Sequence, residues 1–493
     1  MIDNDSFSIL YRFRARILIT ILSCSILFGL PSPHAVGDDR APSTSPPDVL
    51  FIALDDMNSW IQLLDEDAPI QTPNLDRLAA RGTLFTRAYC PSPACNPSRV
   101  ATLTGLRAST TGVYGNKTDW RKVLPDAVTI PQHFKAHGYG TRGAGKIFHH
   151  HYGGAFHDKA SFDDFQLMPD PPDAPMPAAK LNGLNWYGSP NTDWGPWPAE
   201  EADAVDVRTV NYGIRALTQE RAVPLFLAVG IFRPHMPFFA PQRYFDTYAG
   251  DVTMPAIKEG DLDDLPSGAM ALLKPKRWFF EGMMKAEAKE PGTWAEAVRA
   301  YQASATFADA QVGRLLDGLD KSPRGKDTIV VLWSDHGYHL GEKRHWEKFA
   351  LWEQTNRIPF IIVAPGVTTP GSRCDRAVSL IDLYPTLNEL CGLAEKPELD
   401  GQSLVPLLKD PTREWEQPAL MTYGRNNHAV SDGRYRYIRY ADGTEEFYDH
   451  ASDPHEWENG AGEPENAAIM ERLAQWLPKV NAKAGPDMPR PKK

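Results

Sequence analysis

Four stretches of the sequence are continuously apolar and lack the alternation of polar and apolar residues that marks a half-buried strand. They lie at residues 48–54, 225–230, 328–333 and 359–363. Runs of this kind are typical of strands buried on both faces of a sheet. Segments of helical periodicity separate them, at residues 74–81, 130–137, 295–319 and 380–390. Strands that alternate with helices predict an α/β sandwich with a large, mostly parallel central sheet flanked by helices.

Two regions depart from this rhythm. Residues 150–201 are rich in Pro, Gly, Asp and Trp, which predicts an ordered surface loop with a functional role. After residue 411, tyrosine-rich alternation and Asp-Gly turns predict a small antiparallel sheet, followed by a helix at residues 465–476. We therefore expect a main domain at residues 48–411 and a C-terminal α+β subdomain at residues 412–493.

The N-terminus has the pattern of an export signal. Three arginines precede an apolar run at residues 17–30, and small or turn-forming residues follow it. We expect a signal peptide at residues 1–35, a Pro-rich linker at residues 36–47, and export to a periplasmic, extracellular or other secretory compartment. An uncleaved anchor is the alternative. No later segment is apolar enough to predict a membrane span once the signal is removed.

Charge and cysteine content narrow the function classes. The chain has 52 basic and 63 acidic residues and a net charge of −11, which argues against nucleic acid as the main partner. A small anionic substrate remains compatible with this charge, because a local basic pocket can lie in an acidic protein. Few cysteines follow the signal, so the chain is no disulfide scaffold. Whether Cys374 and Cys391 pair is left open.

Acidic residues follow two of the apolar runs. Asp55 and Asp56 follow the first run, and Asp335 and His336 follow the third. Because ligands of open α/β sheets bind beyond the carboxyl ends of the strands, we expect these side chains to meet at one edge. Three carboxylates and one imidazole predict a site for a hard divalent cation, Ca²⁺ or Mg²⁺. The alternative is that these acids are ordinary loop and helix-cap residues.

Cys95 lies in a segment that predicts the start of a helix. Pro97 suits an early helical position, and apolar residues follow it. Backbone N–H groups and the macrodipole at a helix N-terminus favour an anion. A nucleophile at this place is suited to receive a sulfate or phosphate group. The alternative is a small buried cysteine without chemistry.

This segment resembles the signature of the sulfatases. The match consists of Cys95-Asn-Pro-Ser-Arg99 followed by Thr104-Gly-Leu-Arg107, with Thr72-Pro-Asn-Leu-Asp76 and the Asp-Asp strand end fitting the same pattern. In that family the cysteine is oxidised to formylglycine by a maturation enzyme that reads the flanking proline and arginine. The likeness covers nearly the whole exported chain. It implies the alkaline-phosphatase-like form of the sandwich, with residues 48–411 as the catalytic domain.

Three further segments resemble sulfatase motifs. They are Gly145-Lys146-Ile-Phe-His149, Pro234-His235-Met-Pro237 and Trp346-Glu-Lys348. A histidine at position 336, where many members carry asparagine, is shared with the iduronate 2-sulfatases. That branch is the most similar one.

The resemblance implies a role for each matched residue. It makes the strand-end residues ligands of Ca²⁺ and makes Cys95, as formylglycine hydrate, the nucleophile; the ligands are Asp55, Asp56, Asp335 and His336. Asp335 would also take the proton of the attacking hydroxyl. Arg99 would support the hydrate, Lys146 and Lys348 would bind sulfate oxygens, His235 would protonate the leaving alcohol, and His149 would assist sulfate release.

The substrate implied is a sulfated carbohydrate attacked from its end, as in glycosaminoglycan or polysaccharide degradation. Arg233, beside His235, adds a cation that suits the carboxylate of a 2-O-sulfated uronate. One alternative is a phosphate or phosphonate monoester hydrolase, because the same fold serves both chemistries. Another is a carbohydrate-binding protein without activity.

Overall fold

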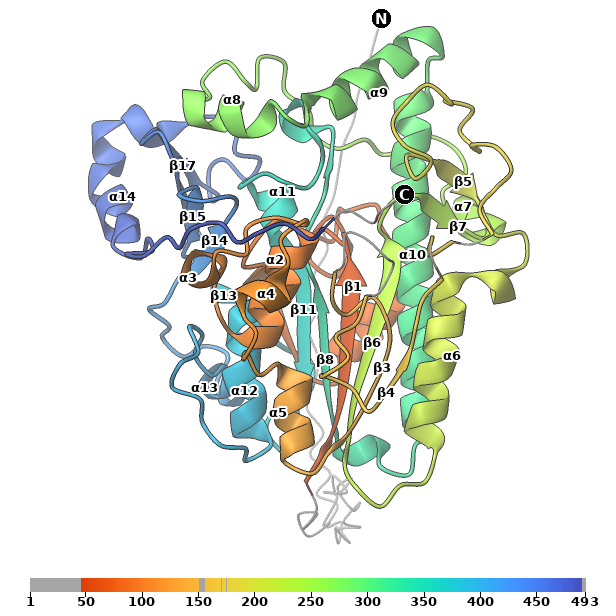
Figure 1. Cartoon of the computed structure of the whole chain (residues 1–493). Coiled ribbons are helices and arrows are strands. Elements are labelled where there is room, and N and C mark those ends of the chain that lie inside the picture. Colours follow the sequence, from red (N-terminus) through yellow and green to blue (C-terminus); the bar gives the residue numbers. More distant parts are fainter. Residues whose placement is uncertain (1–45, 150–155, 170, 174, 490–493) are drawn as a thin grey trace, which may run out of the picture. The chain divides into compact units, whose positions relative to one another are not determined.

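The apolar runs form the middle of a large sheet (Figure 1). The computed structural model describes residues 46–149, 156–169, 171–173 and 175–489. Within them the sheet has nine strands, in the order β12-β2-β11-β8-β1-β6-β3-β4, with β13 also beside β2. β11 is antiparallel to its neighbours, and the other pairs in this sheet are parallel. The bounds are β1 Asp48–Asp55, β2 Thr83–Tyr89, β3 Gly140–Gly145, β4 Asp164–Gln166, β6 Leu225–Pro234, β8 Thr328–Ser334, β11 Arg357–Val363, β12 Ser372–Cys374 and β13 Val378–Ser379.

Helices cover both faces of this sheet, because alternate residues of each central strand point to opposite sides. On β1, Leu50 and Ile52 share a core with residues of α6 and α10, whereas Val49 and Phe51 share another with residues of α2, α5 and α12. The predicted sandwich is confirmed, and Figure 1 shows its two helical layers. The longer helices are α1 Pro73–Ala79, α2 Cys95–Thr104, α5 Ile130–Ala136, α6 Val205–Thr218, α8 Ser267–Leu273, α9 Arg277–Lys289, α10 Thr293–Asp320, α12 Leu383–Leu390 and α14 Ala467–Ala474. Shorter ones are α3 Ala108–Thr111, α4 Trp120–Val123, α7 Gln242–Asp246, α11 Glu353–Asn356 and α13 Val405–Lys409.

The predicted small antiparallel sheet is also present, and within the described residues it has four strands. Its order is β14-β15-β16-β17, with bounds Ala419–Thr422, His428–Ser431, Tyr435–Arg439 and Glu445–Asp449. Met470 and Leu473 of α14 pack on one face, and Tyr89 and Trp352 of the main domain pack on the other. The domain boundary at residue 411 stays a prediction, since residues 45–493 cluster as one unit.

Several features were not evident in the sequence. β2, β3, α6 and α9 were not predicted, and the described part of the Trp-rich segment contributes β4 and β5 (Trp194–Pro196). β5 pairs with β7 (Phe238–Ala240), and β9 (His339–Leu340) pairs with β10 (Trp346–Glu347). Cys374 and Cys391 are free thiols. The predicted signal peptide lies outside the described residues. Among those that are described, no helix is both long and apolar enough to cross a membrane.

Strand register brings distant motifs to one edge of the sheet. Leu54 of β1 lies opposite Ser334 of β8, and Asp55 lies opposite Pro234 of β6. The residues that follow these strands therefore emerge side by side at the carboxyl edge, as predicted from the apolar runs. β3 joins the same edge, since Gly145 lies opposite Gly230 of β6.

Close contact between β3 and β6 depends on these two glycines. A Cβ atom on Gly230 would lie 2.1 Å from the carbonyl oxygen of Lys146, and one on Gly145 would lie 2.0 Å from that of Gly230. Gly145 also has a φ of +75°, which disfavours other residues. Gly145 and Gly230 therefore fix the path of the chain at the end of β3 and the position of Lys146.

We expect Gly230→Ala to lower the free energy of unfolding by about 1–3 kcal/mol, because the added methyl group must displace backbone. Chemical denaturation at equilibrium measures this change. Gly462→Ala is the matched control, since its Cβ would meet nothing within 4 Å and its φ is not positive. Equal stability of the two variants would contradict the close-contact argument.

Candidate active site

Cys95 is the first residue of α2, and its side chain is completely buried. Ala94 before it is extended, and the amide of Ser98 closes the first turn onto the Ala94 carbonyl at 3.0 Å. Pro97 fits within this turn because its missing N–H would have no partner inside the helix. The predicted helix start at the cysteine is therefore present.

Three cationic side chains surround the thiol. The Cys95 Sγ lies 3.2 Å from the Nζ of Lys348, 3.3 Å from the Nε2 of His336 and 3.7 Å from the Nζ of Lys146. Burial opposes ionisation of the thiol, but the two lysines and His336 outweigh burial and hold the pKa of Cys95 well below its usual value. The pocket therefore stabilises a negative charge at this point.

The predicted metal ligands contact these same cationic groups and the thiol. Asp55 forms an ion pair with Lys146, and Asp56 forms one with Lys348 at 2.8 Å. The His336 Nδ1 lies 3.0 Å from the carbonyl oxygen of Gly337, to which it donates when protonated. This contact leaves the Nε2 of His336 directed at Cys95 and Asp335, at 3.3 and 3.6 Å.

These groups fit a divalent cation. Ligand atoms of Asp55, Asp335, His336 and Cys95 lie within 4.8 Å of one another, and so do those of Asp55, Asp56, Cys95 and His235. Burial raises the pKa of Asp335; Arg99 opposes this rise, and the neighbouring Asp55 adds to it. A cation would relieve this crowding of carboxylates. Oxygen donors with one imidazole suit Ca²⁺ or Mg²⁺.

A second cluster of such side chains has a different character. Glu353, His450 and Glu456 also lie within reach of one ion, but the guanidinium of Arg436 is already among them. It pairs with Glu353 and lies 2.7 Å from Glu456. Because the cluster already contains its cation, we assign it a structural role.

Arg99 and two residues that the sequence did not single out hold the strand ends together. The Nε of Arg99 donates to Asp335 at 2.7 Å, and its NH1 donates to the Ile147 carbonyl at 3.2 Å. Ser98 donates to the Asp335 carbonyl at 2.6 Å. The Tyr301 hydroxyl donates to the carbonyl of Asp56, whose φ is +65°. Ser98 lies within the cysteine motif, whereas Tyr301 gave no signal in the sequence.

The two predicted proton-transfer residues also face this pocket. His235 is one-quarter exposed, its Nδ1 lies 2.6 Å from the Met236 carbonyl, and its Nε2 lies 4.0 Å from Asp56. The neighbouring Cys95 raises the pKa of the His149 imidazole, but burial has the larger and opposite effect. Burial lowers the pKa of His149 to about 4, so its ring is neutral at pH 7 and able to accept a proton.

Arg233 is predicted to bind substrate, but its guanidinium is already engaged by protein groups. Its guanidinium is buried, pairs with Asp173 of the Trp-rich segment and donates to the Phe239 carbonyl at 2.7 Å. The backbone amides of Phe232 and Arg233 donate to buried Asp206. In this arrangement Arg233 holds the segment against the end of β6, and its charge is already balanced by protein.

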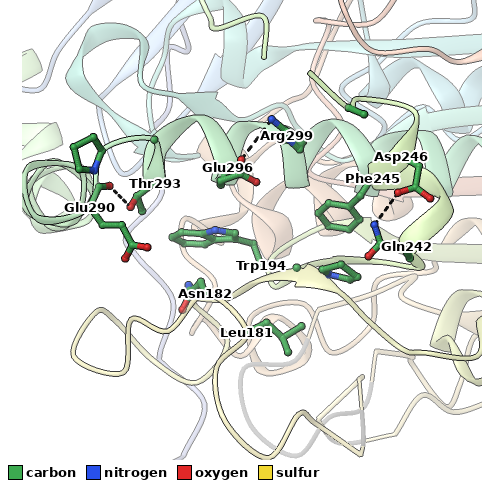
Figure 2. A pocket seen from close by; sticks show the side chains of 15 residues that line it. Leu181, Asn182, Trp194, Gln242, Phe245, Asp246, Glu290, Thr293, Glu296 and Arg299 are labelled. Atoms are coloured by element: carbon green, nitrogen blue, oxygen red, sulfur yellow. Dashed lines mark hydrogen bonds and ion pairs between the residues drawn. The ribbon is translucent and has the colours of Figure 1, made fainter. Parts of the chain in front are cut away.

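Figure 2 shows a separate cavity of about 510 Å³, between the segment around Trp194, α7 and the start of α10. None of the predicted site residues lines it. Its lining includes three carboxylates, those of Asp246, Glu290 and Glu296, and one guanidinium, that of Arg299. This acidic lining is unsuited to an anionic ester.

A buried pocket that concentrates lysines around one side chain favours a tetrahedral oxyanion. The adjoining carboxylates would hold a cation that offsets charge on the same anion. This chemistry, at the carboxyl edge of an α/β sheet, defines a hydrolase of sulfate or phosphate esters.

Comparison with protein families decides between a sulfate ester hydrolase and a phosphate ester hydrolase. The sulfatase family model matches residues 47–393, and the chain therefore belongs to the sulfatase family and is a sulfuric ester hydrolase. A second model, N-sulphoglucosamine sulphohydrolase, C-terminal, matches residues 341–483.

Two relatives show how far the likeness extends. A sulfatase of Formosa agariphila is 40% identical over 453 residues, which cover 88% of this chain and 87% of that protein. Human iduronate 2-sulfatase is 29% identical over 388 residues, which cover 71% of this chain and 70% of that protein. The predicted similarity to iduronate 2-sulfatases is confirmed.

Solved structures agree on the fold. A 2-O GAG sulfatase superposes with a TM-score of 0.66 at 22% identity, covering 88% of this chain and 91% of that one. A phosphonate monoester hydrolase from Silicibacter pomeroyi superposes with a TM-score of 0.71 at 22% identity, covering 87% of this chain and 94% of that one. At such identities the likeness concerns the fold alone.

Proposed function

We propose that the protein is an exported, calcium-dependent sulfatase that removes sulfate from the end of a sulfated carbohydrate. In this proposal a maturation enzyme converts Cys95 to formylglycine. The observation that carries the proposal is the position of Cys95 at the start of α2, with lysine ammonium groups 3.2 and 3.7 Å from its sulfur.

The aldehyde explains why a cysteine is encoded here. Attack on sulfur by the thiol itself would leave a stable thiosulfate ester. The hydrate of formylglycine supplies one hydroxyl that attacks sulfur and another that allows sulfate to leave when the carbonyl forms again.

Lys146 and Lys348 bind the sulfate oxygens in this mechanism. Each is buried and already balances a carboxylate, so its ammonium group is fixed rather than free to move. Fixed cations in a dry pocket stabilise developing charge more strongly than water does. Asp55, Asp56, Asp335 and His336 would hold a divalent cation, which would supply further positive charge to stabilise the sulfate. Asp335 is positioned by Arg99 to take the proton of the attacking hydroxyl.

His235 donates the proton that the departing alcohol needs. When its Nδ1 donates to the Met236 carbonyl, the Nε2 remains for the substrate. Its partial exposure places it where the alcohol would leave. His149, neutral and half-buried, takes the proton released when sulfate departs.

We expect His235→Gln to lower kcat/KM for alkyl sulfates by about 10²–10⁴-fold, the usual contribution of general acid catalysis. Activated aryl sulfates should lose much less, because their leaving groups need little protonation. Parallel steady-state assays measure both, with His137→Gln, an exposed histidine of the α5 end, as control. Equal losses of kcat/KM on the two substrate types would contradict the role of His235 as general acid.

The proposed sugar is a 2-O-sulfated uronate, and its support is the likeness to human iduronate 2-sulfatase. Arg233 does not add to this support, because Asp173 already pairs with it. Assays of sulfated uronides against neutral sulfated sugars test the proposal, and equal turnover would refute the uronate. Phosphonate monoesters belong in the same assays because that chemistry shares the fold.

A further inference from the structure

The solvent face of α9 carries an aromatic and basic stripe. Trp278, Glu281, Lys285 and Lys289 follow one another at spacings that place them on one side of the helix, and all four are exposed. From Trp278 to Lys289 the helix rises about 16 Å. Lys285 and Lys289 form no ion pair within the described residues, so their charges are available to a ligand.

A second exposed tryptophan extends this stripe. The Lys289 Nζ lies 4.7 Å from the centre of the Trp186 ring. The next residue, Tyr187, packs against Gly282, where an added Cβ would lie 2.4 Å from its ring, and its hydroxyl donates to the Phe279 carbonyl at 2.7 Å. Trp186 is therefore held beside α9. We call Trp186, Trp278, Lys285 and Lys289 the α9 ridge.

Both tryptophans of the ridge are exposed to solvent. Trp278 and Trp186 are 47% and 49% exposed, although each has a large apolar surface. Exposed aromatic rings interleaved with cations suit a ligand with apolar faces and anionic groups, because rings stack while ammonium groups pair with anions. A sulfated sugar chain has both properties.

The residue just before α9 contacts the segment that carries Lys348. Lys276, just before α9, lies 3.0 Å from the Glu347 carboxylate and 3.9 Å from the centre of the Phe349 ring. These two residues flank Lys348, which contacts Cys95. Figure 1 shows α9 beyond the carboxyl ends of the central strands, the edge where the site lies.

The acidic cavity marks the other end of the ridge. Directly after Lys289, Glu290 lines the cavity of Figure 2, together with Asp246 and Glu296. A polyanion would be attracted along α9 and repelled beyond it. Its binding length is therefore limited to the span between the catalytic pocket and this cavity.

We propose that the α9 ridge binds a sulfated polysaccharide that extends outward from the catalytic pocket. Trp278 and Trp186 stack on sugar rings, and Lys285 and Lys289 pair with sulfate groups. The inference rests on the proposed function and deepens it: the substrate is a chain of several sugars, of which the pocket receives the terminal one.

Kinetics on substrates of increasing length test this inference. We expect Trp278→Ala and Lys285→Ala/Lys289→Ala to lower kcat/KM for sulfated oligosaccharides by about 5–50-fold through KM, as expected for one stacking contact or two ion pairs. Turnover of an aryl sulfate should stay unchanged, because the ridge lies outside the pocket. The matched controls are Trp476→Ala and Lys321→Ala. Trp476 follows α14, Lys321 follows α10, and both side chains are exposed. Equal losses on both substrates, or none on oligosaccharides, would overturn the inference.

Binding separates this inference from the proposed function. The Cys95→Ala chain should bind dextran sulfate, and binding should weaken at least about fivefold in the ridge variants and at high salt. Uncharged dextran should bind much more weakly. Binding to polyglutamate as strong as to dextran sulfate would reject the role of sugar stacking. If no sulfate ester is hydrolysed but the ridge still binds dextran sulfate, the proposed function is wrong, whereas binding of sulfated polysaccharide by the α9 ridge is supported.

Discussion

Replacement of Cys95 by alanine is expected to abolish sulfate ester hydrolysis and leave the protein folded. The loss should exceed about a thousandfold, since removal of a covalent nucleophile leaves only binding and electrostatic effects. Cys95→Ser should behave in the same way unless the expression host also converts serine. Steady-state assays with an aryl sulfate measure the loss.

Stability should survive this change because the charges around Cys95 are balanced without it. Lys146 keeps its ion pair with Asp55, and Lys348 keeps its ion pair with Asp56, which has an N–O distance of 2.8 Å. A small side chain is replaced by one slightly smaller, which costs about 1 kcal/mol in a core. Thermal unfolding of the variant checks this expectation.

Cys90 provides the matched control within the chain. It is also buried and lies five positions earlier, but burial raises the pKa of its thiol well above the usual value. Its Sγ lies 3.6 Å from the Thr355 carbonyl oxygen and 3.8 Å from the Asn356 side chain, rather than beside the lysines. Cys90→Ala should therefore retain activity.

Mass spectrometry of the peptide that contains Cys95 should detect the aldehyde or its hydrate in active protein from a host with the maturation enzyme. Full activity of a preparation with an unmodified thiol at this position would falsify the proposed nucleophile. Full activity of Cys95→Ala would do the same.

The predicted metal ligands illustrate which positions could be inferred from the sequence. Asp55 and Asp335 end buried apolar runs, and the ends of parallel strands meet at one edge regardless of loop structure. Two local patterns therefore sufficed to bring residues 280 positions apart to the same place, where the Asp55 and Asp335 carboxylates share Arg99.

Other parts depend on contacts that no local pattern encodes. β3 contains three glycines and no apolar run, so the position of Lys146 followed only from its motif. Arg233 finds its partner Asp173 sixty positions earlier, in the Trp-rich segment between β4 and β5. α9 was missed because its first turn has no side-chain cap, and its buried face became evident only beside Tyr187.

Asp335→Asn is expected to lower kcat/KM more than about a hundredfold, because a bound metal ion contributes several kcal/mol of charge stabilisation in the transition state. Asparagine keeps the shape of the side chain and removes its charge. Arg99 still has Asp55 at 3.4 Å, so the strand ends should remain joined. Chelation of the wild-type protein should cause a similar loss, which Ca²⁺ restores at lower concentration than Mg²⁺ if flexible coordination decides the choice of ion.

Thermal unfolding gives a readout that does not depend on turnover. A cation that binds only the folded state raises Tm by mass action, and in Asp335→Asn this rise should require a higher calcium concentration. Asp309→Asn is the matched control: this buried carboxylate accepts the amides of Asn74 and Leu75 far from the thiol. Its loss should lower Tm and leave the calcium dependence unchanged. Full turnover by protein that elemental analysis finds free of metal would mean that the lysines alone stabilise the sulfate, and that the crowded carboxylates serve only to hold those lysines in place.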